Sequence, residues 1–107
     1  MTMNSELKAK WVEALRSGDY AQGLRALRKG NSFCCLGVLC DVMGAKWDSG
    51  EDDLNATLNG EKQDYYLAPE ALATVGMTDK EQEVLYGMND NEGKTFHEIA
   101  DYIEANL

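Results

Sequence analysis

The longest nearly apolar run of the chain is FCCLGVLCDVMG, residues 33–44, in which Asp41 is the one charged side chain. A run of this length exceeds a typical strand, and Gly44 before a polar segment is a common end of a helix. We therefore predict a central helix over residues 33–43, apolar on almost all sides and buried over most of its surface. Ser32 is a candidate for its N-cap.

The pattern of the segment before this run predicts two further short helices. Asn4 or Ser5 can cap a first helix, which ends near Ser17 because a glycine follows there. A second piece is expected over residues 20–29, with its two leucines turned inward. The turn that follows, residues 30–32, then leads into the central helix.

The segment after Gly44 differs in composition, because it is rich in acidic residues and poor in large apolar residues. We expect residues 48–64 to form an acidic loop or hairpin insertion, with Asn59-Gly60 as a hairpin turn. Residues 65–67 suit a short strand. Lys46-Trp47 is a candidate for the same minor β element.

The last third of the chain carries the clearest helix signals. Proline opens a short helix over residues 69–75. Capping boxes at residues 78–81 and 95–98 open two more helices, the first ending near residue 88. The whole pattern predicts a mainly α protein of the α+β class. Residues 1–107 would form a single small domain of about five helices around the buried central helix, with a minor β-hairpin.

The net charge of -9 is unevenly distributed. Residues 1–30 carry six basic and three acidic side chains, a balance of +3, whereas residues 31–107 carry four lysines and 16 acids, a balance of -12. We therefore expect the whole chain to be repelled by nucleic acid, while its first third can still attract phosphate groups locally.

No apolar run approaches the roughly 18 residues that a membrane span needs. The amino terminus also lacks the charged and apolar regions of a signal peptide. We expect no contact with a membrane and a location in the cytoplasm.

Three cysteines lie close together at positions 34, 35 and 40, and His97 is the one histidine. Together these residues have the composition of a zinc site but lack paired CxxC spacing. We expect the three cysteines to act as small buried hydrophobic side chains, and we expect the protein to hold no metal and no cofactor. The alternative is a catalytic thiol near a helix amino terminus, with His97 as its base.

Two residues inside the run are unusual for an apolar helix and require a compensating contact. Gly37 in mid-helix costs roughly 1 kcal/mol against alanine, so we expect another backbone to approach it closely. Asp41 needs a hydrogen-bond donor or a cation in an apolar helix, and Arg25 or Arg28 are the expected partners.

Residues 16–29, the basic segment, are the strongest candidate for a ligand-binding site. Arg25 and Arg28 would hold phosphate, Tyr20 would stack on a base, and Gln22 and Asn89 would bond its polar edges. The alternative is a solvated basic face paired with the acids of the same protein.

Four segments carry a resemblance to a known group of proteins. They are LRSGDYAQG (15–23), FCCLGVLCD (33–41), MNDNEGKTF (88–96) and IADYI (99–103). Together they resemble a family of small accessory proteins of tailed phages. The resemblance implies a phage source and the cytoplasm of an infected bacterium as the setting, and it transfers no catalytic residue.

The resemblance and the residues together give three hypotheses of function. The first is a non-enzymatic counter-defence protein that sequesters a nucleotide-derived signalling molecule, as a homo-oligomer. The second is an acidic decoy or inhibitor that binds a host protein through its negative charge. The third is a small hydrolase with a cysteine nucleophile.

Overall fold

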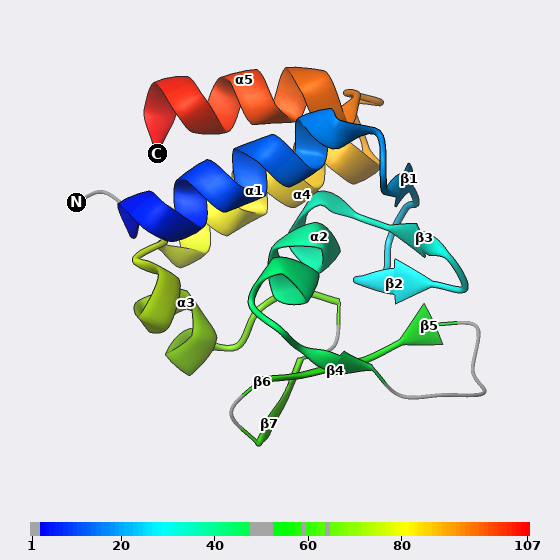
Figure 1. The fold of residues 1–107 in the computed structure, drawn as a ribbon, viewed down its shortest axis with the longest axis vertical. Coiled ribbons are helices and arrows are strands. Elements are labelled where there is room, and N and C mark those ends of the chain that lie inside the picture. Colours follow the sequence, from blue (N-terminus) through cyan, green and yellow to red (C-terminus); the bar gives the residue numbers. More distant parts are fainter. Residues whose placement is uncertain (1–2, 48–52, 59, 64) are drawn as a thin grey trace.

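The computed structural model describes residues 3–47, 53–58, 60–63 and 65–107 (Figure 1). Its helices are α1 (Ser5–Ser17), α2 (Cys35–Val42), α3 (Pro69–Val75), α4 (Asp79–Asp90) and α5 (Phe96–Asn106). Its strands are β1 (Ala21–Gln22), β2 (Arg28–Lys29), β3 (Ser32–Phe33), β4 (Lys46–Trp47), β5 (Asp53–Leu54), β6 (Ala56–Leu58) and β7 (Glu61–Gln63).

The helices form the larger part of the molecule. In Figure 1, α1, α4 and α5 lie together at one side, with α2 between them and the strands. Helix α1 packs against α5 and α2, and α2 packs against α4. Trp11, Leu85, Ile99 and Ile103 from these helices are fully buried. The predicted class, mainly α within α+β, is confirmed.

The strands form two small sheets. The first has the order β1-β3-β2-β5, with β1 parallel to β3 and the other pairs antiparallel. The second, β4-β6-β7, is antiparallel throughout and contains the predicted minor hairpin, with Leu58 opposite Glu61. Residues 48–52, 59 and 64 of the predicted acidic insertion, including Asn59 of the expected turn, lie outside the described residues.

The predicted central helix is confirmed as α2, but it begins at Cys35 and not at Phe33, because Phe33 pairs with Arg28 as part of β3. Every residue from Cys35 to Cys40 is buried. The indole Nε1 of Trp11 donates to the carbonyl oxygen of Cys35 at 2.9 Å, which joins α1 to the start of α2. The prediction of Ser32 as N-cap is wrong. Ser32 pairs within β3, and the Sγ of Cys34 accepts from the Gly37 N–H at 3.4 Å instead.

The helix predicted over residues 20–29 is wrong, because backbone partners elsewhere in the fold replace the helical hydrogen bonds. The Gly23 N–H donates to the Phe33 carbonyl at 2.7 Å, and residues 21–22 and 28–29 pair as strands. Arg25 has a positive φ of 60°, which no helix interior allows. Leu27 is buried as expected, whereas Leu24 is 50 % exposed.

The strand predicted over residues 65–67 is also wrong. The side-chain amide of Gln82 accepts from the Leu67 N–H at 2.8 Å and donates to the Leu67 carbonyl at 3.1 Å. One glutamine of α4 thus satisfies the backbone groups that a neighbouring strand would otherwise bond. Tyr65 and Tyr66 remain on the surface, 57 % and 54 % exposed.

The helices of the last third begin where their signals predict. Pro69 opens α3, and Thr78 and Thr95 each form a complete capping box with the glutamate three residues later. Helix α4 continues to Asp90, two residues beyond the predicted end. Across the described residues, no helix has the length and apolar character needed to cross a membrane.

Candidate ligand-binding site

Tyr20 and Asp41 belong to one hydrogen-bond network. The predicted pairing of Asp41 with Arg25 or Arg28 is wrong. The Tyr20 hydroxyl donates to Asp41 Oδ2, and the Trp47 indole Nε1 donates to Asp41 Oδ1 at 3.1 Å. The Tyr20 ring meets Phe33 edge to face, with centroids 5.0 Å apart. Two neutral donors therefore satisfy this half-buried carboxylate, and Tyr20 is not available as an open stacking platform.

Arg28 is packed against aromatic rings. Its guanidinium carbon lies 5.1 Å from the ring centroid of Phe33 and 5.6 Å from that of Trp47, within cation–π range. Its Nε donates to the Gly30 carbonyl at 2.8 Å. The rings and the turn thus fix this guanidinium in place.

Asn89 is buried, with only 1 % of its surface exposed. Its amide oxygen accepts two hydrogen bonds, and its amide nitrogen donates two. Its Oδ1 accepts from Gln22 Nε2 at 3.0 Å and from the Cys35 N–H at 3.3 Å. Its Nδ2 donates to the Gly23 carbonyl at 2.9 Å and to Asp90 Oδ1 at 2.8 Å. Asn89 joins α4, α2 and the loop after β1, and this is a structural role.

Arg25 differs from the other predicted site residues. Its side chain is exposed and forms no ion pair with another described residue. It lines a hollow of about 210 Å³ together with Tyr65, Tyr66, Tyr86 and Asp90. The rings of Tyr66 and Tyr86 are stacked, with centroids 5.8 Å apart and planes at 26°. A guanidinium without an ion-pair partner among the described residues thus lies beside an aromatic platform.

The backbone of Arg25 is strained to reach this position. A left-handed conformation costs a residue with a Cβ about 1–2 kcal/mol. The Arg25 N–H donates to Asp90 Oδ1 at 3.0 Å, and Asn89 binds the same oxygen. The contact with α4 therefore holds the strained residue in place. Strain of this kind in a residue other than glycine is concentrated at functional sites.

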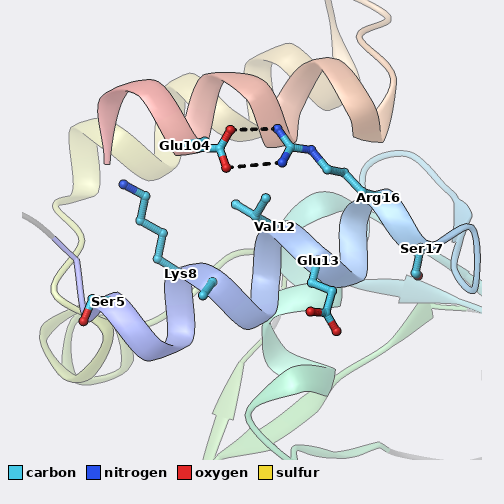
Figure 2. A pocket seen from close by; sticks show the side chains of 8 residues that line it. Ser5, Lys8, Val12, Glu13, Arg16, Ser17 and Glu104 are labelled. Carbon is cyan, nitrogen blue, oxygen red and sulfur yellow. Dashed lines mark hydrogen bonds and ion pairs between the residues drawn. The ribbon is translucent and has the colours of Figure 1, made fainter.

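The groove between α1 and α5 is a larger hollow, of about 740 Å³ (Figure 2). Its lining residues are Ser5, Lys8, Ala9, Val12, Glu13, Arg16, Ser17 and Glu104. Arg16 is already paired here, with Asp101 at 2.6 Å and with Glu104 at 3.1 Å. Because this guanidinium is neutralised by α5, the groove is a weaker candidate for binding an anion than the hollow beside Arg25.

The cysteines are buried, as expected, and all three thiols are free. Burial raises the pKa of Cys34 to about 11 and also raises the pKa values of Cys35 and Cys40 above their ordinary value. His97 is exposed on α5. A thiol with a raised pKa is a poor nucleophile, so the arrangement does not favour the hydrolase hypothesis. Within the described ranges, no group of three or more His, Cys, Asp or Glu is placed to hold a metal.

Tyr20 gives a titration prediction. Burial and the hydrogen bond to Asp41 raise the pKa of Tyr20 from 10.0 to about 12. The folded protein therefore holds this proton more tightly than the unfolded chain, so the stabilisation is complete below pH 10.0 and is lost as the pH rises through about 12. We expect Tyr20→Phe to remove a late ionisation step near pH 12 from an ultraviolet titration of the protein. A titration in which Tyr20→Phe keeps the late step would contradict this assignment.

The structure thus separates the five residues that the sequence nominated. Tyr20 and Arg28 lie in the aromatic network, Gln22 and Asn89 bond each other, and Arg25 lies apart beside the tyrosines. The three tyrosines at this hollow were not among the residues that the sequence nominated. They come from the loop after β7 and from α4, and only the fold brings them to Arg25.

No curated protein and no solved structure matches this chain. One family does match, over residues 3–74, and it is described as a domain of unknown function (DUF8296). The matched residues include α1, both sheets, α2 and most of α3, with Arg25, Tyr65 and Tyr66 among them. The chain therefore belongs to the DUF8296 family.

Proposed function

We propose that this protein is a non-enzymatic binding protein that sequesters a nucleotide-derived molecule at the hollow beside Arg25. The single observation that carries the proposal is the guanidinium of Arg25, free of ion pairs with the described residues and held on a strained backbone next to the stacked rings of Tyr66 and Tyr86. Arginine binds phosphate through a planar fork of donors, and tyrosine rings stack on bases.

The charges of the hollow favour one orientation of such a ligand. Asp90 is the acidic lining residue and would repel phosphate, so the phosphate lies on the side of Arg25. A base stacked on Tyr66 or Tyr86 can turn an amino group toward the Asp90 carboxylate. Stacking of a base on an aromatic ring contributes about 1–3 kcal/mol.

The proposed setting comes from the resemblance to small tailed-phage proteins. In that setting the protein acts in the cytoplasm of an infected bacterium, as a homo-oligomer, and removes a signalling nucleotide of the host defence. The balance of -12 over residues 31–107 supports a small ligand over a nucleic acid, whose many phosphates would be repelled.

Arg25→Ala is expected to weaken binding of the nucleotide by at least about tenfold. A charge-assisted hydrogen bond contributes about 1.5–3 kcal/mol, and about 1.4 kcal/mol corresponds to a factor of ten. Calorimetric titration with AMP, ADP, ADP-ribose and cyclic dinucleotides measures this change, and chromatography of the recovered ligand checks that it is not converted.

Arg16→Ala is the matched control for Arg25→Ala, because it removes the same charge from the groove between α1 and α5. Arg28→Ala tests the guanidinium that packs on Phe33. We expect both variants to keep their affinity for the ligand. Absence of heat from every nucleotide, or equal losses in all three variants, would reject the proposal.

The acidic decoy is the second candidate, and one surface favours it. The side chains of Asp101 and Glu104 are 74 % and 62 % exposed on α5, with Glu98 exposed on the same helix. A host protein bound through these carboxylates would dissociate steeply as salt is added. Binding of a nucleotide at Arg25 would be insensitive to Asp101→Asn, which separates the two candidates.

A further inference from the structure

The hollow beside Arg25 is too small to hold a whole ligand. Its volume is about 210 Å³, whereas pockets for small molecules measure about 300–1,000 Å³. A single ring with its phosphate fills such a space, and the remainder of a larger molecule must lie elsewhere. The surface beside this hollow offers a place for that remainder.

A second hollow, of about 760 Å³, shares Tyr65 and Tyr66 with the first. Its lining residues are Lys62, Tyr65, Tyr66, Leu67, Ala68, Pro69, Leu72, Ala73, Met77 and Asp79. Most of these are apolar, and they come from β7 and the loop after it, from α3, and from the turn that leads into α4 with the first residue of α4. The adjacent tyrosines therefore form a wall shared by two hollows. The small one is lined by Arg25 and Asp90 as well as tyrosines, and the large one is mostly apolar.

Buried amides hold this wall in place. Gln82 bonds both the N–H and the carbonyl of Leu67, and Gln63 Oε1 accepts from the Ala68 N–H at 2.6 Å. Gln63 and Gln82 are each only 1 % exposed. Two buried side chains thus fix the backbone directly after the tyrosines, so the rings are presented on an ordered turn. Exposed tyrosines on a rigid backbone bind at low entropic cost.

We infer that the ligand carries two flat ring systems joined through phosphate, as in a dinucleotide. This inference rests on the proposed function. One base lies in the hollow of Arg25 and Tyr86, and the second lies across the tyrosine wall, against the apolar face of Ala73 and Met77. The Asp79 carboxylate lines the second hollow and can accept a hydrogen bond from an amino group of that base.

The first test compares ligands on the unmodified protein. Calorimetric titration with AMP, the linear dinucleotide pApA and cyclic di-AMP, and with their guanine counterparts, measures the effect of the second ring. We expect at least one dinucleotide to bind at least tenfold more tightly than either mononucleotide. Mononucleotide binding without any gain from the second ring would reject the second subsite and leave the proposed function standing.

The second test fills the second hollow. Ala73 is exposed in α3 and lines this hollow, so Ala73→Trp adds bulk there without entering the core. The variant is expected to bind the dinucleotide no better than the mononucleotide, with mononucleotide affinity unchanged. Ala9→Trp is the matched control, because Ala9 is an exposed alanine that lines the groove between α1 and α5. It should keep the full gain.

The outcomes separate the two claims. A dinucleotide gain that survives Ala73→Trp would reject the second hollow as its origin. Failure of every ligand to bind the unmodified protein would instead reject the proposed function itself. Far-ultraviolet circular dichroism of both tryptophan variants confirms that they are folded before they are compared.

Discussion

Gly37→Ala is expected to lower the free energy of unfolding by about 3 kcal/mol or more, at the upper end of the cost of overpacking. A Cβ at this position would lie 1.7 Å from the carbonyl oxygen of Leu27 and 2.6 Å from its carbonyl carbon. These atoms are backbone, so no rotamer change relieves the clash. Alanine gains only about 1 kcal/mol of helix propensity over glycine, so the clash dominates.

Gly87→Ala is the matched control, since Gly87 is also inside a helix. A Cβ added there would meet no atom of the described residues within 4 Å beyond its own stretch of helix. The propensity gain then stands alone, and the variant should be stabilised by up to about 1 kcal/mol. Urea unfolding followed by circular dichroism measures both variants. Equal and small effects at the two glycines would contradict the close approach of α2 to the Leu27 backbone.

The close approach at Gly37 could be predicted from the sequence because its signal is local. A glycine in the middle of an apolar helix costs stability, and a packing contact is the usual compensation. The capping boxes at Thr78 and Thr95 are equally local, since cap and partner are three residues apart. Elements specified by neighbours in the sequence were therefore predicted correctly.

The errors arose where backbone or side-chain groups distant in the sequence replace the expected local bonds. Residues 20–29 carry helix-compatible leucines, but Gly23 bonds Phe33 and Arg25 bonds Asp90, so the segment folds against other elements. The strand at residues 65–67 fails because Gln82 satisfies the Leu67 backbone. A side chain that substitutes for a strand has no signature in the spacing of apolar residues.

The candidate site could be predicted only in part for the same reason. The sequence shows several arginines, and only the fold shows which are already paired or packed. Arg16 is bound by α5 and Arg28 lies on aromatic rings, so Arg25 is the arginine without an ion pair among the residues that the structure describes. The tyrosines that complete the hollow lie 40 to 61 residues further along the chain.

Asn89→Ala is expected to lower the free energy of unfolding by about 2–4 kcal/mol. The substitution removes four hydrogen bonds, and it leaves the Cys35 N–H and the Gly23 carbonyl without this partner in the interior. A buried polar group left unsatisfied costs about 1–3 kcal/mol. The same change frees Asp90 Oδ1 from one of its two donors, so the strained Arg25 backbone is held less firmly.

Asn91→Ala is the control for Asn89→Ala, because Asn91 lies two residues further on and is exposed. It should change stability by less than about 0.5 kcal/mol. Asn89→Asp is the sharper probe. It preserves size and the acceptor for Cys35 but places an acceptor where Nδ2 now donates to Gly23 and Asp90. We expect that variant to be strongly destabilised at neutral pH and to recover as acid protonates the new carboxylate, since a protonated acid regains one donor. If thermal unfolding shows Asn89→Asp to be as stable as the unmodified protein at neutral pH, Asn89 does not join α2, α4 and the Arg25 loop as described.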